Sequence, residues 1–215
     1  MFSAVPLSSL PVMGTAGNTT EFLDGDGTEE NPYLISNKTH LNNVRKYLDA
    51  HFKMVADIEF TDADFAEGGE FYNDGQGWEP IGSGPASPFW GSLDGDNHII
   101  IGLICRQAVS DTSSVYVGLF GYNQGTIKNL GMVNSEILSS FYATTGGIVG
   151  RNDGGTISHC HNTGTIASQA IVGGIAGSNS GVVSYCFNTG NVNASGSKGG
   201  GITGENSGTI SYCYN

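Results

Sequence analysis

Basic residues are scarce in this sequence. Eight Lys and Arg stand against 20 Asp and Glu in 215 residues, which gives a formal net charge of −12. Proteins that bind nucleic acid or anionic lipid present basic surfaces to the phosphates, so neither partner is expected. The sequence also lacks any run of about 20 apolar residues, the length of a membrane-spanning helix, and no membrane insertion is predicted.

Motifs for metal chemistry are missing as well. The zinc-peptidase pattern His-Glu-x-x-His does not occur. Only four cysteines are present, and three of them, Cys160, Cys186 and Cys213, recur at spacings of 26 and 27 residues. Small buried residues of a repeat show such spacing, so we expect free thiols in the core. His159 and His161 flank Cys160 but should point away from it, because neighbours along a strand face opposite sides.

The most informative feature that is present is a repeat between Gly118 and Asn215. A unit of the form Gly-(Leu/Ile)-x-Gly-x-Asn-x-Gly-x-(Ile/Val)-x-x-(Leu/Cys) occurs four times. Its period is 27 to 29 residues, as marked by Asn123, Asn152, Asn179 and Asn206. Periods of 20 to 50 residues indicate solenoids, propellers or arrays.

The content of one repeat selects among these architectures. Each repeat has no room for a helix and holds three short runs rich in β-branched residues, as in Gly147–Val149, Thr156–Cys160 and Thr165–Ala167. This pattern predicts an all-β fold, a right-handed, single-stranded parallel β-helix of about five coils with three strands in each. The repeated asparagines are expected at corners, because Asn tolerates left-handed backbone and its amides can bond along a ladder.

These units resemble the GLUG-motif repeats of secreted and surface proteins of bacteria. Such repeats also occur N-terminal to the catalytic domain in bacterial immunoglobulin-A peptidases. The resemblance covers residues 90–215 well, and Asp24–Ile35 and Phe52–Ile58 resemble segments that often precede such repeats. It implies a β-helix that is secreted or held at the cell surface. It implies no particular activity, because the motif occurs in proteins of many activities.

Three regions follow from this pattern. Residues 1–20 are expected to be a flexible lead-in or a signal-peptide remnant, since no Lys or Arg precedes Lys38. Residues 21–88 are predicted to form an N-terminal cap, with a capping helix at 37–48, a first strand at Lys53–Phe60 and an acidic loop. Residues 89–215 hold the GLUG-like repeats. The fourth repeat stops within a coil, so we expect the repeats to continue in a longer chain and the last coil to have an open edge.

Acidic residues suggest two kinds of chemistry. Asp57, Asp62 and Asp64 lie in the acidic loop and could hold calcium, which takes oxygen ligands. No other cofactor is expected. Asp94 and Asp96 are the best-placed carboxylate pair for a hydrolase or lyase acting on polysaccharides. The same residues, in Asp-Gly-Asp-Asn, are also typical of a plain turn.

A set of aromatic residues flanks the cysteine column in three successive repeats. If the cysteines point inward, these side chains point outward and should form a flat patch across three coils. Aromatic faces pack on sugar rings, and contiguous exposed apolar area marks interaction sites. A purely structural role is the alternative, since strands favour aromatics. The six candidate ligand-binding residues are His159, His161, Tyr185, Phe187, Tyr212 and Tyr214.

The sequence as a whole favours a non-catalytic extracellular or cell-surface module of a larger bacterial protein. We expect it to act as an adhesin or stalk whose binding face takes a glycan or a host or cell-surface protein. Two alternatives stay open at this point. One is a polysaccharide-active β-helix enzyme, and the other is a structural spacer without a ligand.

Overall fold

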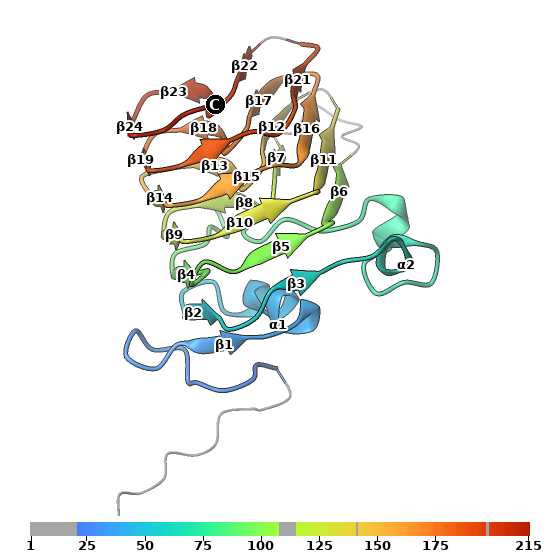
Figure 1. The fold of residues 1–215 in the computed structure, drawn as a ribbon, viewed down its shortest axis with the longest axis vertical. Coiled ribbons are helices and arrows are strands. Elements are labelled where there is room, and N and C mark those ends of the chain that lie inside the picture. Colours follow the sequence, from blue (N-terminus) through green and yellow to red (C-terminus); the bar gives the residue numbers. More distant parts are fainter. Residues whose placement is uncertain (1–20, 108–114, 141, 197) are drawn as a thin grey trace, which may run out of the picture.

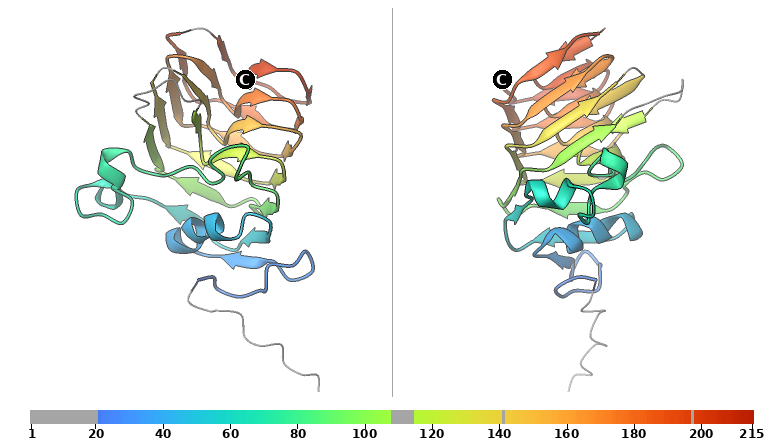
Figure 2. Two further views of the ribbon diagram at one scale, coloured as in Figure 1. Left: turned by 180° about the vertical axis from the view of Figure 1, so that it is seen from behind. Right: turned by 90° about the vertical axis from the view of Figure 1, so that its right-hand side faces the viewer.

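Short parallel strands stack into a column of coils in the computed structural model (Figures 1 and 2). The structure describes residues 21–107, 115–140, 142–196 and 198–215, so the predicted lead-in at residues 1–20 lies outside the described residues. The predicted all-β parallel β-helix is confirmed. It has about four full turns where five were expected, because three of its sheets contain four strands each.

The longest sheet has seven strands, and we call it the long sheet. It begins well before residue 89, so the predicted boundary there does not interrupt the sheet. The strands of the long sheet are β1 (Tyr33–Ile35), β2 (His51–Met54), β4 (Ser92–Asp94), β9 (Thr126–Lys128), β14 (Thr156–Ser158), β19 (Val182–Ser184) and β24 (Thr209–Ser211).

Four further sheets complete the column. The five-stranded sheet contains β3 (Ile58–Glu59), β5 (Ile99–Ile101), β10 (Gly131–Val133), β15 (His161–Asn162) and β20 (Phe187–Asn188). The first four-stranded sheet contains β6 (Ile104–Gln107), β11 (Glu136–Ser139), β16 (Thr165–Ser168) and β21 (Val192–Ala194). The second contains β7 (Val115–Val117), β12 (Ala143–Gly146), β17 (Ile171–Gly173) and β22 (Lys198–Gly200). The third contains β8 (Phe120–Asn123), β13 (Val149–Asn152), β18 (Ala176–Asn179) and β23 (Thr203–Asn206).

One turn therefore passes through five strands, and the prediction of three per coil was wrong. The predicted run at Gly147–Val149 is displaced, since β13 starts only at Val149. The core columns are as expected, because strand side chains alternate between inside and outside. Ile127, Ile157 and Val183 lie in register in the long sheet and are fully buried.

The repeated asparagines form buried ladders inside the column. Asn123, Asn152 and Asn179 have no solvent exposure, and each donates its amide to the next asparagine at 2.7–2.8 Å. They end strands β8, β13 and β18, and none of them has a positive φ. The left-handed corner expected of these asparagines instead falls at other residues, including Asn129 and Tyr185.

The N-terminal region folds as a helix and a loop against the first turns. The capping helix is shorter than the predicted 37–48: α1 spans Lys38–Asn43 and continues as a 3-10 turn, η1, at Val44–Lys46. Its N-cap is Asn37, whose Oδ1 accepts a hydrogen bond from the backbone N–H of His40 at 2.9 Å. The preceding loop helps to cover this end of the core, since the Phe22 ring stacks on Tyr33 at 4.3 Å.

The predicted first strand at Lys53–Phe60 is divided into β2 and β3, in two different sheets. The acidic loop that follows is ordered and projects to the side of the column (Figure 1). It holds two short helical segments, α2 (Asp62–Phe65) and η2 (Asn73–Gly75). Four aromatic side chains anchor this loop to the column and are buried: Phe60, Phe65, Phe71 and Trp78.

Candidate functional site

The corner between the long sheet and the five-stranded sheet has the same bend in successive turns. His159, Tyr185 and Tyr212 occupy it with φ of 53°, 52° and 54°, and Asn129 has a φ of 54° one turn earlier. A left-handed conformation costs a residue other than glycine about 1–2 kcal/mol, and Asn bears it best. The backbone alone would therefore favour Asn or Gly at these positions, so the aromatic side chains need another explanation.

Two columns of aromatic rings run along this corner. The corner column contains His159, Tyr185 and Tyr212, whose ring centroids are 4.8 and 4.7 Å apart with planes within 10°. The strand column contains His161, Phe187 and Tyr214, whose centroids are 4.8 and 5.1 Å apart with planes 4° apart. Between the two columns Cys160 and Cys186 point into the core and are buried. The structure thus brings all six predicted residues together.

The rings do not form the flat patch that the sequence suggested. Because they stack face to face, they turn their edges and polar atoms to solvent. Tyr185 is 51% exposed and Tyr212 75%, while Tyr214 is 61% exposed. Among the described residues no further ring stacks on Tyr212 or Tyr214, so each of these two exposed rings has one face that no other ring covers.

His161 is the most enclosed polar member of the columns. Its ring lies over Gly131, where a Cβ atom would come within 2.4 Å of Cε1. Burial lowers the pKa of His161 below its usual value, because desolvation disfavours the charged imidazolium. The ring is therefore neutral at pH 7 and can stack with Phe187 as an uncharged ring.

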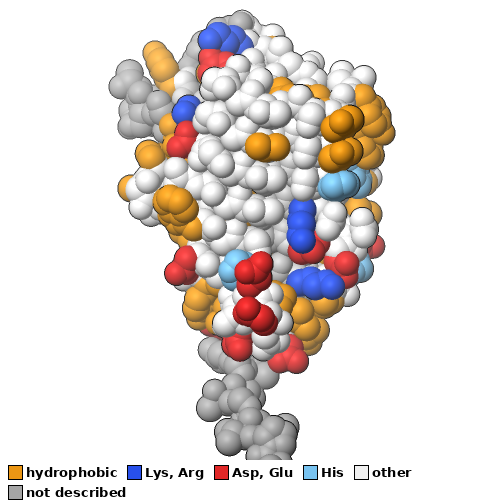
Figure 3. Space-filling model, turned by 90° about the vertical axis from the view of Figure 1, so that its left-hand side faces the viewer, with side chains coloured by type: hydrophobic (Ala, Val, Ile, Leu, Met, Phe, Trp, Pro, Cys, Tyr) orange, Lys and Arg blue, Asp and Glu red, His pale blue; other side chains and the backbone are white. Residues whose placement is uncertain are grey.

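Charged side chains lie next to one another on the side of the molecule shown in Figure 3, on strands β2, β4 and β9 and the turn after β4. Lys128 pairs with Asp94 at 3.2 Å, and Lys53 pairs with Asp96 at 3.0 Å. Burial alone would raise the pKa of Asp94, but hydrogen bonds from Asn129 and the Asp96 amide, together with Lys128, lower it. An ionised, lysine-paired Asp94 cannot supply the proton that glycoside hydrolysis requires.

The calcium candidates have separate partners. Asp57 accepts hydrogen bonds from the His98 ring at 2.9 Å and the Ile99 backbone N–H at 3.0 Å. Asp64 accepts a hydrogen bond from Lys38 Nζ at 2.7 Å, and its carboxylate forms a capping box with Thr61, the N-cap of α2. Asp62 lies exposed in the first turn of α2. Within the described ranges, no three His, Cys, Asp or Glu residues are grouped as metal ligands would be.

A groove on the outer side of the long sheet was missed by the sequence reasoning. It measures about 460 Å³, and its lining includes Trp90, His51, Ser92, Thr126 and Lys128. Trp90 is 59% exposed. The sequence feature that could have revealed this groove is Trp90 itself, which stands before the regular repeats at a corner where those repeats carry polar residues.

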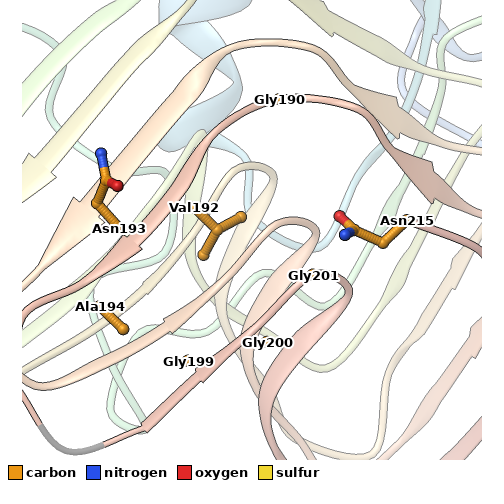
Figure 4. Close-up of a pocket in the computed structure, with 8 residues that line it drawn as sticks. All are labelled: Gly190, Val192, Asn193, Ala194, Gly199, Gly200, Gly201 and Asn215. Carbon is orange, nitrogen blue, oxygen red and sulfur yellow. The ribbon is translucent and has the colours of Figure 1, made fainter.

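A second hollow lies at the C-terminal end of the column (Figure 4). It measures about 580 Å³ and is lined mostly by glycines and small side chains, with Val192, Asn193 and Asn215 among them. Its lining contains no acidic, basic or aromatic side chain. It is the open end of the core above the last turn, and its lining offers little chemistry for recognition.

Comparison with known proteins identifies the repeat. The GLUG motif matches residues 142–167. A protein of Evansella cellulosilytica provisionally named a Gly-rich membrane protein is 37% identical over 142 residues, which are 64% of this chain and 15% of that protein. Halomucin of Haloquadratum walsbyi is 30% identical over 162 residues, which are 73% of this chain and 2% of halomucin. The chain therefore spans only a small part of both proteins.

A solved structure shows the same architecture. It is a Bacteroides ovatus protein provisionally described as an immunoglobulin A1 protease, with a TM-score of 0.62 and 27% identity over 89% of this chain and 58% of the other. No helix in the described part of this chain is long and apolar enough to cross a membrane. The predicted resemblance is confirmed: the chain carries a GLUG motif at residues 142–167 and folds as a parallel β-helix similar to that of the Bacteroides ovatus protein.

Proposed function

We propose that this chain is a non-catalytic module of a secreted or surface protein, and that its aromatic columns bind a protein on another surface. The observation that carries the proposal is the corner column. Tyr185 and Tyr212 occupy left-handed positions that the backbone would give to Asn or Gly, and their side chains are more than half exposed. A row of exposed side chains held in a backbone conformation that costs free energy favours a role in recognition.

The chemistry of the columns suits a protein partner better than a glycan. Tyrosine is enriched at protein interfaces because it combines a large apolar body with a hydrogen-bonding hydroxyl. Within the columns the stacked rings present edges and hydroxyls, and the open face that a sugar ring needs occurs only at the column ends, as at Tyr212 and Tyr214. A location outside the cell is supported by the names of the relatives, which describe a mucin and a membrane protein.

The experiment measures binding of the labelled protein to intact bacterial and host cells. The test variant is Tyr185→Asn/Tyr212→Asn, which removes both rings while placing a residue that tolerates the left-handed backbone. The matched control is Tyr142→Asn, because Tyr142 is also exposed (58%) with a positive φ of 66°, in another part of the column.

We expect saturable binding by wild type and Tyr142→Asn, strong loss in the double variant, and loss after the cells are treated with protease. Binding that survives protease but not glycosidase would assign the columns to a glycan. Equal binding by wild type and the folded double variant would remove them from recognition. If none of the proteins binds any cell, the chain is better described as a spacer.

A further inference from the structure

Trp90 is an exposed aromatic residue that the repeat does not require. Its corner lies one turn before that of Gln124, since Phe89 bridges Asn123 and the Gln124 backbone N–H donates to the Phe89 carbonyl at 2.8 Å. The equivalent residues in later turns are polar: Gln124, Asp153, Ser180 and Ser207. Trp90 has neither a stacked ring nor a cation over its face among the described residues. Stacking of the coils therefore gives no reason for an indole here.

The backbone holds Trp90 firmly in this position. The N–H groups of Trp90 and Gly91 both donate to the carbonyl of Leu48, at 2.8 and 2.9 Å. The chain passes so close to the previous turn that a Cβ on Gly91 would lie 1.8 Å from the carbonyl oxygen of Ala50. Because the backbone is already fixed, a ligand that covers the indole has to order only the side chain, which favours binding.

The groove beside Trp90 continues along strands β2, β4 and β9. Strands β2, β4 and β9 are neighbours about 4.8 Å apart, so the groove spans about 10 Å across them, which suits an oligosaccharide better than a single sugar. Its floor carries hydroxyl and imidazole groups, since His51 Nδ1 and Ser92 Oγ are 2.8 Å apart. A tryptophan face at one end of a row of hydrogen-bonding groups matches the two sides of a sugar ring, one apolar and one polar.

Charge narrows the class of ligand. The charged residues of the lining are Lys53, Lys128, Glu29 and Asp94. Lys128 pairs with Asp94, and Lys53 pairs with Asp96, which lies outside the lining. An acidic sugar would find no unengaged lysine in this groove, and the chain as a whole carries −12. A neutral sugar needs only hydrogen bonds. A lysine and a carboxylate that pair with each other can still donate and accept further hydrogen bonds to sugar hydroxyls.

We propose that this groove is a binding site for neutral oligosaccharides, with one sugar ring stacked on the Trp90 indole and its neighbours bonded over Ser92 and Lys128. The site lies on different strands from the aromatic columns and does not depend on the function proposed for them. The proposal is for binding alone, since Asp94 is already engaged by Lys128 and Asn129.

Tryptophan fluorescence offers a direct test. The chain has two tryptophans, and Trp78 is fully buried, so acrylamide quenching reports chiefly on Trp90. The intact chain is titrated with neutral oligosaccharides of glucose, mannose, galactose and N-acetylglucosamine, and with acidic oligouronides. Binding is also measured by calorimetry with wild type, Trp90→Ala, Ser92→Ala and Tyr185→Asn, after circular dichroism has shown that each is folded.

We expect at least one neutral series to protect Trp90 from quenching and the oligouronides to have no effect. Trp90→Ala should weaken binding by about tenfold or more, which is a loss of at least about 1.4 kcal/mol, because both the stacking contact and the apolar area it buries are removed. Ser92→Ala should weaken it less, and Tyr185→Asn should leave it unchanged. Loss in Tyr185→Asn alone would move the sugar site to the columns. No protection by any neutral series, preference for oligouronides, or release of cleaved sugar would overturn the proposal.

Discussion

The side-chain amide of Asn152 donates a hydrogen bond to Oδ1 of Asn179 at 2.8 Å, and both side chains are fully buried. The Asn179 amide in turn donates a hydrogen bond to Asn206 at 2.8 Å, and Asn179 Oδ1 also accepts one from the Gly181 backbone N–H. No buried side-chain nitrogen or oxygen of the described residues lacks a partner. The ladder therefore ties successive turns together with satisfied polar groups in a narrow core.

Asn179→Leu should destabilise the chain strongly. The substitution removes the acceptor of the Gly181 backbone N–H, which lies against the previous turn. It also takes one acceptor from the Asn152 amide, which keeps the carbonyls of Gly155 and Val182. A buried unsatisfied group costs about 1–3 kcal/mol, so we expect the free energy of unfolding to fall by about that amount in urea denaturation.

The matched control for this ladder is Asn206→Ala. Asn206 is exposed, and Asn179 keeps backbone acceptors at Gly181 and Thr209 when Asn206 is lost. The cost should stay below about 1 kcal/mol, as for most exposed sites. Equal losses in the two variants would show that burial of the ladder does not govern its strength.

Much of this fold follows from the repeat itself. The period and the alternation around Ile127 and Ile157 are enough to predict stacked parallel coils. The number of strands per turn is not predictable in the same way, because segments such as Gly146–Ile148 are too short and glycine-rich to show a period. The left-handed corner was assigned to residues like Asn179 on propensity, but buried hydrogen bonds hold that side chain in the ladder, and the bend falls at Tyr185.

Of the two candidate sites, the aromatic columns could be predicted from the repeat and the groove at Trp90 could not. Equal spacing placed Tyr185 and Tyr212 together, but the way the rings stack depends on a backbone angle that spacing does not reveal. The groove at Trp90 joins His51 to Ser92, which are 41 residues apart and outside the regular repeats. Only the register between β2 and β4 brings them into contact, so no local pattern predicts the groove.

The stability of the chain should fall in mildly acidic solution because of His161. Its pKa is lowered in the folded state by burial, so below about pH 6.5, the ordinary value, the unfolded chain takes up a proton that the folded chain resists. Folding stability rises with pH wherever the unfolded state binds more protons, so it is lost as pH falls through this range.

His161→Phe should remove this part of the pH dependence while keeping a ring on Phe187. The measurement is urea denaturation of both proteins between pH 8 and pH 5, where the difference in stability should grow in favour of the variant as pH falls. Parallel curves for the two proteins would contradict the assignment to His161.

The four thiols should differ in reactivity by depth and by position along the column. All are free, and burial raises the pKa of Cys105 to about 12, so it is almost entirely the unreactive thiol at pH 8. Cys213 lies in the last turn and is only half-buried. We expect a maleimide to label Cys213 first under native conditions, as mass spectrometry of digested protein would show. Labelling of Cys105 at the same rate would mean that the N-terminal turns open as readily as the last one.

The last turn should open more easily than the middle of the column. Strands β21, β22, β23 and β24 end their sheets and have a neighbour on one side only. Ile210 is 38% exposed, while its counterpart Ile157 is fully buried. Each turn of a solenoid is stabilised by its neighbours, so opening at the edge breaks about half the contacts of an inner turn. Amide hydrogen exchange should therefore be at least about tenfold faster in Gly201–Asn215 than in Gly147–Cys160. Equal protection in a monomer would mean that the turns unfold together, and the ladder would then act along the whole column instead of turn by turn.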